Sequence, residues 1–227
     1  MIRMEPKSAT FPIAIYAIYI IIKTINITLI YETTTLFSLI TILFVALVIA
    51  SQRDIKRMFA YSTMENMALI LLGFVLGNVA LFGSILIILT HAFAKAGAFY
   101  SSGNLIESYR TRNMFQIQNV MGEQRPMAYT LILSTLAVSG APPFGTFLGE
   151  FFIFSALYSQ GMGILMAILA ILLVIIFLSI NYKVLKMVFS NAPPAFTQKI
   201  SAQQLFITGA TVTVSGIFAF LFMVGIL

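Results

Sequence analysis

The sequence predicts an all-α polytopic membrane protein, with about seven transmembrane helices, one of them broken at Pro142-Pro143, and a cytoplasmic N-terminus. Hydrophobic residues make up 60% of the 227 residues and charged residues 9%, whereas an ordinary soluble domain is about 25% charged. Several apolar runs reach the ~20 residues that a helix needs to cross a bilayer. Too few polar side chains remain to coat a globule, so a soluble monomer is excluded.

The apolar runs divide the chain into seven predicted crossings within one transmembrane domain, residues 1–227. Each run is bounded by charged, polar or proline-containing stretches, as expected for helices that end at the membrane surface. In chain order the crossings are residues 11–30, 35–50, 57–76, 79–103, 126–157, 162–189 and 201–227.

The positive charges give the orientation. With alternating sides, all thirteen Lys and Arg residues except Lys23 and Lys95 fall on the same side of the membrane. The positive-inside rule makes that side cytoplasmic. The N-terminus, the turn 52–57, the loop 104–125 and the loop 190–199 are expected there. We interpret the turn 52–57 as a topology anchor with internal ion pairing.

Residue counts exclude several classes of site. The chain has no Cys and one His, which excludes disulfides, thiolate metal sites, iron–sulfur ligation and a His-rich metal centre. We therefore expect no cofactor and no metal on this chain. The basic residues punctuate apolar runs, which favours a membrane partner over nucleic acid.

Lys23 is the first ionisable residue expected inside the membrane. It follows the start of the first crossing by twelve residues, about 18 Å along a helix. A charge at that depth costs roughly 2.5–3.5 kcal/mol, so Lys23 should face the bundle interior and find a partner or water. It is either a relay lysine or a structural lysine bonded to backbone carbonyls.

His91 and Lys95 are four residues apart on the fourth crossing, and therefore on nearly the same helix face. With water between them, one proton could step along this pair. The small residues around them, mostly Ala and Gly, allow close helix contact or leave room for water. The alternative is a satisfied core histidine beside a lysine that extends to the surface.

The fifth crossing should break in mid-membrane. Pro142 and Pro143 have no amide proton, and Gly140 and Gly145 flank them. The helix should restart near Gly145 or Thr146 and carry Glu150 in its opening turns. A broken helix is tolerated only where protein or water satisfies the freed backbone groups. Glu150 is thus an ion-relay candidate, or else a locally bonded acid beside a packing kink.

Glu65 lies about two turns inside the third crossing. Two interpretations are equally open at this stage. It is either a relay carboxyl on the cytoplasmic side or a helix-end carboxylate paired with Lys56 or Arg57.

Three motifs together resemble one known family. They are QRDIKRMFAYST at residues 52–63, HAFAKAGAF at residues 91–99 and GAPPFGTFLGE at residues 140–150. These motifs are similar to those of the antiporter-like proton-translocating subunits of respiratory complex I, multisubunit sodium/proton antiporters and membrane-bound hydrogenases. The YSTMEN and AKAGAF variants look most like the hydrogenase branch.

The resemblance implies two inverted five-helix repeats, each with a broken helix, and a hydrated polar axis at mid-membrane. It implies that Lys23 is the central relay lysine, that His91 and Lys95 lie on the linking helix, and that Glu150 ends the relay. The chain matches the C-terminal half of the family. We expect a split subunit, a shortened homologue or a partial sequence, and the first of these requires another chain that supplies the N-terminal half.

The function implied by the resemblance is ion translocation, with the proton as the expected ion, in a redox-driven complex of the hydrogenase or quinone oxidoreductase type. Iron–sulfur clusters or other redox centres are expected only in partner subunits. Expected partners are other membrane subunits, peripheral redox subunits and lipid, in a prokaryotic cell membrane. The alternatives are a sodium/proton antiporter module and a truncated, non-conducting structural subunit.

Overall fold

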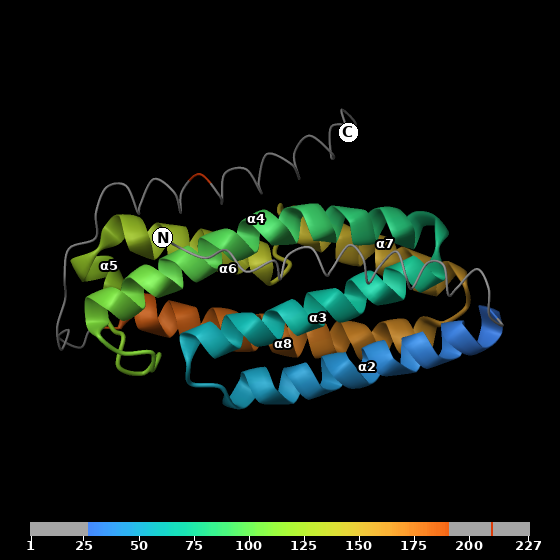
Figure 1. The fold of residues 1–227 in the computed structure, drawn as a ribbon, viewed down its shortest axis with the longest axis horizontal. Helices are drawn as coiled ribbons and strands as arrows, with labels where there is room; N and C mark the ends of the chain where they lie inside the picture. Colours follow the sequence, from blue (N-terminus) through green and yellow to red (C-terminus); the bar gives the residue numbers. More distant parts are fainter. Residues whose placement is uncertain (1–26, 191–209, 211–227) are drawn as a thin grey trace, which may run out of the picture.

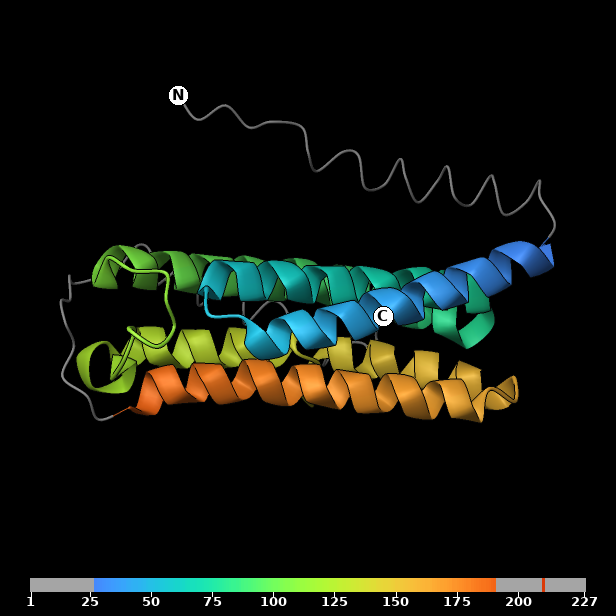
Figure 2. The ribbon, with the colours of Figure 1, turned by 90° about the horizontal axis from the view of Figure 1, so that it is seen from below.

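The computed structural model describes residues 27–190 and residue 210 as a bundle of long, nearly parallel helices (Figures 1 and 2). The first and last predicted crossings lie almost wholly outside the described residues, as does Lys23. The helices in chain order are α2 (Ile27–Ser51), α3 (Ile55–Leu76), α4 (Asn78–Tyr109), α5 (Val120–Glu123), α6 (Arg125–Val138), α7 (Gly145–Ser159) and α8 (Gly163–Phe189).

The helices confirm the predicted all-α membrane fold. Four of them, α2, α3, α4 and α8, are each long and apolar enough to cross a membrane. Helices α6 and α7 lie end to end beside α4 and together form the predicted broken crossing (Figure 1). The basic turn 52–54, the loop 110–119 and the end of α8 gather at one end of the bundle, as the charge pattern predicted (Figures 1 and 2).

Two predicted boundaries were wrong at polar stretches that remain helical. Residues 27–30, assigned to the first crossing, belong to α2, where the Thr33 hydroxyl donates to the Leu29 carbonyl at 2.7 Å. No Gly or Pro interrupts this stretch, so the helix continues through it. Likewise α4 runs six residues beyond the predicted end at 103, because Leu105 is fully buried and Tyr109 donates to the Gln118 carbonyl at 3.0 Å.

The turn before α3 is also built differently from the prediction. Helix α3 begins at Ile55, and the Asp54 carboxylate accepts a hydrogen bond from the Arg57 backbone N–H at 3.1 Å. This is an N-cap, which satisfies one of the free N–H groups at the helix start. The predicted internal ion pairing of the turn was therefore wrong for Asp54, whose carboxylate caps the backbone.

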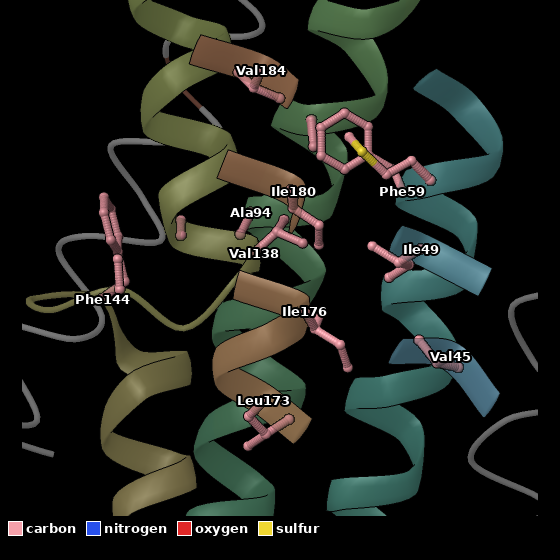
Figure 3. Packing of buried hydrophobic residues seen from close by; sticks show 14 of the residues in the cluster. Val45, Ile49, Phe59, Ala94, Val138, Phe144, Leu173, Ile176, Ile180 and Val184 are labelled. Carbon is pink, nitrogen blue, oxygen red and sulfur yellow. The ribbon is translucent and has the colours of Figure 1, made fainter. Parts of the chain in front are cut away.

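The core lies where α2, α3, α4, α6 and α8 converge. Figure 3 shows Ile49, Phe59, Ala94, Val138 and Ile180, one from each of these helices, pointing into the same space. All five are essentially inaccessible to solvent. Large apolar side chains on the outer faces of α2 and α8 remain exposed, as expected for helices in a hydrocarbon environment.

Helices α4 and α7 approach each other closely at small residues. A side chain at Gly83 would place its Cβ 2.6 Å from the Gly149 carbonyl oxygen, and one at Gly145 would lie 2.3 Å from Thr90 Cγ2. Such contacts let backbones approach in a membrane, where no hydrophobic force drives helices together. The second half of the broken helix is thus held directly against the helix that carries His91 and Lys95.

Candidate functional site

The Lys95 side chain lies between α4 and α3 and is bonded to polar groups of α3. It is the eighteenth residue of the 32-residue helix α4 and only 8% exposed. Its ammonium donates to the Phe59 carbonyl and the Ser62 hydroxyl of α3. It also lies 5.7 and 5.8 Å from the ring centroids of Phe59 and Phe99. The cation is therefore bound inside the bundle and does not extend to the surface.

His91 lies one turn from Lys95 on α4 and is buried. Neither ring nitrogen has a hydrogen-bond partner among the described residues. Buried polar atoms are nearly always hydrogen-bonded to protein or water, so the two ring nitrogens need a partner that the described residues do not supply. The alternative of a core histidine satisfied by protein groups does not match this geometry.

Glu65 is buried in the middle of α3, with 3% exposure. Its Oε2 and the neighbouring Asn66 Oδ1 have no hydrogen-bond partner in the part of the chain that the structure describes. The cation that acts on it electrostatically is Lys95, whereas Lys56 and Arg57 are exposed at the helix start. Glu65 therefore does not lie at a helix end, as the predicted pairing with Lys56 or Arg57 required, and its role as a relay carboxyl stays a prediction.

The helix break occurs where the prolines predicted it, between Val138 and Gly145. Two side chains donate hydrogen bonds to polar groups around the helix break. The Thr146 hydroxyl donates to the Ala137 carbonyl at 2.6 Å, and Asn181 of α8 donates to the Ser139 hydroxyl at 2.9 Å. Sequence analysis missed both residues. The signals were a Thr directly after the restart and a lone Asn in the apolar run of α8.

Glu150 lies across the break against Gly140. A Cβ on Gly140 would sit 2.4 and 2.7 Å from the two Glu150 carboxyl oxygens, and Gly140 has a φ of +74°. Glycine is therefore required there both for the backbone conformation and for the space that the carboxyl occupies. The residue is partly buried. The predicted residues Gly140, Gly145 and Glu150 thus form one unit around the break.

These ionisable groups form a connected set. Glu150 and Glu65 act on each other electrostatically, as do Glu65 and Lys95, and Lys95 and His91. The set joins α7, α3 and α4 in the bundle interior. Four of the five predicted relay residues are thereby brought together, and the fifth, Lys23, lies outside the described residues.

The chemistry of this set is proton or cation handling. The described residues contain no cluster of three or more His, Cys, Asp or Glu side chains that could hold a metal ion. They offer two carboxyls, an amine and an imidazole, with unpartnered buried atoms on Glu65 and His91. Such groups, rare inside membranes, mark ion pathways and proton relays.

Comparison with known proteins identifies the family of this chain. The family described as NADH:quinone oxidoreductase/Mrp antiporter, transmembrane part, matches residues 8–179. The chain belongs to this family. The resemblance predicted from the three motifs is therefore confirmed.

Two named relatives show how much of the family protein this chain covers. It is 32% identical over 127 residues to the hydrogenase-4 component F homolog of Methylacidiphilum infernorum, covering 56% of this chain and 27% of the relative. It is 31% identical over 193 residues to F(420)H(2) dehydrogenase subunit N of Methanosarcina mazei, covering 81% and 39%. The chain therefore spans between a quarter and two fifths of the length of these relatives.

Solved structures share the fold. A chain of the Mrp complex from Dietzia sp. DQ12-45-1b superposes with a TM-score of 0.76 at 16% identity, covering 84% of this chain and 44% of that one. A chain of the membrane-bound sulfane sulfur reductase, an archaeal respiratory membrane complex, gives 0.74 at 20% identity, covering 86% and 40%. At these identities the likeness concerns the fold.

Proposed function

We propose that this chain is an ion-translocating membrane subunit of a redox-driven multisubunit complex, with the proton as the transported ion. The observation that carries the proposal is the connected set of Lys95, His91, Glu65 and Glu150 in the bundle interior, next to a broken helix. Packing alone does not need ionisable side chains, because burying them in a membrane costs free energy. Such side chains are instead characteristic of proton and ion pathways.

The proposed path runs from Lys95 and His91 to Glu150. The Lys95 ammonium gives a proton to Glu65 through water that fits beside the unpartnered atoms of Glu65 and His91. Glu65 passes it to Glu150, which lies across the break against Gly140. Release occurs on the side opposite the basic loops, because α7 runs from the break toward that side (Figure 1). Lys23 is proposed as the residue that supplies Lys95.

The energy source belongs to other subunits. The chain has no Cys and so no thiolate ligand for an iron–sulfur cluster. We propose that redox centres lie in peripheral partner subunits and that a change in charge or conformation there drives the proton steps. Its further partners are other membrane subunits, among them a chain or segment that supplies the N-terminal half. The proposed location is a prokaryotic cell membrane. The names of the hydrogenase and F(420)H(2) dehydrogenase relatives support this class of complex.

The test replaces the two carboxyls separately by amides in the assembled complex. Glu150→Gln and Glu65→Gln keep the side-chain shape but cannot carry the proton. Glu107→Gln is the matched control, because Glu107 is exposed on α4. The measurement is ions moved per electron in proteoliposomes, once with and once without sodium in the buffer.

We expect both interior variants to lose about 10²-fold in ion movement, the lower end of what a positioned proton carrier contributes, and the control to keep it. Unchanged movement in both interior variants of an intact complex contradicts the proposal and leaves a structural subunit. Movement that vanishes without sodium identifies a sodium/proton antiporter module.

A further inference from the structure

A cavity of about 390 Å³ opens at the basic end of the bundle, between α2, α8 and the segment 114–118. Its wall is partly cationic and partly apolar. Lys183, Lys186 and Tyr182 line it from α8, and Met114, Phe115 and Ile117 line it from the loop before α5. The relay residues of the proposed function lie elsewhere, so this cavity has no part in the path described above.

Two cations meet at one aromatic ring on the rim of this cavity. Arg53 Cζ lies 5.8 Å and Lys186 Nζ 5.5 Å from the centroid of the Phe115 ring. Both side chains are exposed, and neither forms an ion pair with a carboxylate in the part of the chain that the structure describes. The neighbouring carboxylate, Asp54, is engaged as the N-cap of α3. Two cations at one ring, neither of them paired with a carboxylate, favour the approach of an anion.

Lys183 adds positive charge to the cavity wall, but its ammonium hydrogens are already bonded to protein carbonyls and cannot bind an anion. Its ammonium donates to the carbonyls of Ile49, Ala50 and Gln52, which occupies all three of its hydrogens. An anion in the cavity would therefore be held directly by Lys186, which lines it. Arg53, on the Phe115 ring, and Lys183 would contribute through their positive charge.

We propose that this cavity binds the phosphate headgroup of an anionic phospholipid. The cations lie at the ends of membrane-crossing helices on the predicted cytoplasmic side, the level at which lipid phosphates lie. Basic pockets between transmembrane helices on this side suit such headgroups. Phe115, 44% exposed, offers an apolar surface to the first acyl carbons, and Tyr182, 66% exposed, is an amphipathic ring of the kind found at the membrane interface.

The experiment compares two double variants of the complex, purified in detergent with its full complement of subunits. Arg53→Gln/Lys186→Gln removes the two cations at Phe115. Lys56→Gln/Arg57→Gln is the matched control, because it removes two exposed cations from the same end of the bundle. Each complex is titrated with cardiolipin, phosphatidylcholine and inorganic phosphate, and bound lipid is counted by native mass spectrometry.

We expect wild type and control to bind cardiolipin more tightly than phosphatidylcholine, and the Phe115 variant to lose about tenfold in apparent affinity for cardiolipin. Equal loss in both variants, or equal binding of the two lipids, overturns the proposal. Displacement of bound lipid by millimolar inorganic phosphate identifies a site for free phosphate and also overturns it. Loss of a partner subunit from the variant, with lipid binding unchanged, assigns the cations to an acidic protein surface instead.

Discussion

Lys95 and Lys183 make the same kind of contact at two levels of the bundle. Each donates from its ammonium to backbone carbonyls of a helix other than its own. Lys95, on α4, reaches the Phe59 carbonyl and the Ser62 hydroxyl inside α3. Lys183, on α8, reaches the carbonyls of Ile49, Ala50 and Gln52 at the end of α2, the last two at 3.0 and 2.9 Å.

The acceptors of the two lysines differ in whether they have other hydrogen-bond donors. The last carbonyls of a helix have no N–H partner within the helix, and the partial negative charge there favours a cation. Lys183 therefore satisfies the Ala50 and Gln52 carbonyls, which would otherwise depend on water, and adds a second donor to the Ile49 carbonyl, which also accepts from the Gln52 N–H at 3.2 Å. The Phe59 carbonyl lies inside α3 and also accepts from the Ser62 and Thr63 hydroxyls, at 3.1 and 3.3 Å. It stays bonded whether or not Lys95 donates to it.

This difference predicts a structural role for Lys183 and a role for Lys95 in the proposed ion path. Lys95 can give up its proton without leaving an orphaned acceptor, and Glu65 and His91 lie close enough to respond to its charge. The ammonium of Lys183 holds α8 to the end of α2, and its loss would leave the Ala50 and Gln52 carbonyls without this donor, while the Ile49 carbonyl keeps the Gln52 N–H. The following substitutions test that contrast.

The largest expected effect is that of Lys95→Met on ion movement. Methionine fills a similar volume but carries no proton, so translocation should fall about 10²-fold, as for loss of a positioned proton carrier. Stability should also fall, by about 3–5 kcal/mol, because the substitution leaves the buried Glu65 carboxyl without the cation that acts on it. The measurement is ions moved per electron together with the thermal unfolding of the complex. Translocation at the wild-type rate would remove Lys95 from the path.

Lys183→Met should differ from Lys95→Met in its effect on ion movement. We expect a loss of about 1–3 kcal/mol of stability, because carbonyls at the end of α2 lose a charged donor, and unchanged ion movement per electron. Hydrogen exchange of the amides at residues 49–54 reports the local loosening. Lys186→Met is the matched control, since Lys186 lies on the same helix and contacts the Phe115 ring instead of the α2 carbonyls. Equal loosening in the two variants would show that the effect is one of charge alone.

Sequence reasoning anticipated what depends on neighbours along the chain. The break at Pro142-Pro143 follows from two missing amide protons, and the restart at Gly145 was placed correctly. The pairing of His91 with Lys95 follows from their spacing of four on a helix. These features need no knowledge of which helices touch.

What sequence reasoning missed depends on the register between helices. Nothing local shows that Lys183 meets the end of α2, across more than 130 residues, or that Asn181 supports the break through Ser139. The same limit left Glu65 undecided, because its partner could be named only once α3 and α4 were aligned. The positive-inside pattern counted Lys183 correctly as a charge on one side but gave no indication of its contacts.

Arginine substitutions sharpen the contrast at constant charge. Arginine stays protonated, so Lys95→Arg keeps the cation but blocks proton release, and we expect roughly a tenfold loss of ion movement. Lys183→Arg should remain within about twofold of wild type, because Lys183 is partly exposed and a guanidinium can still donate to several carbonyls. The measurement is again ions moved per electron. Full activity of Lys95→Arg would mean that Lys95 acts only through its charge.

The smallest expected effect is that of Ser62→Ala, which removes the one side-chain acceptor of Lys95. The ammonium keeps the Phe59 carbonyl and both aromatic rings, so ion movement should fall only about fivefold, which corresponds to about 1 kcal/mol for one hydrogen bond. Ser101→Ala is the control, because the buried Ser101 hydroxyl bonds the Gly97 and Ala98 carbonyls of its own helix. Lys183 has no counterpart to this variant, since all its acceptors are backbone carbonyls that no substitution removes. An equal fall in both serine variants would show that Ser62 does not position Lys95.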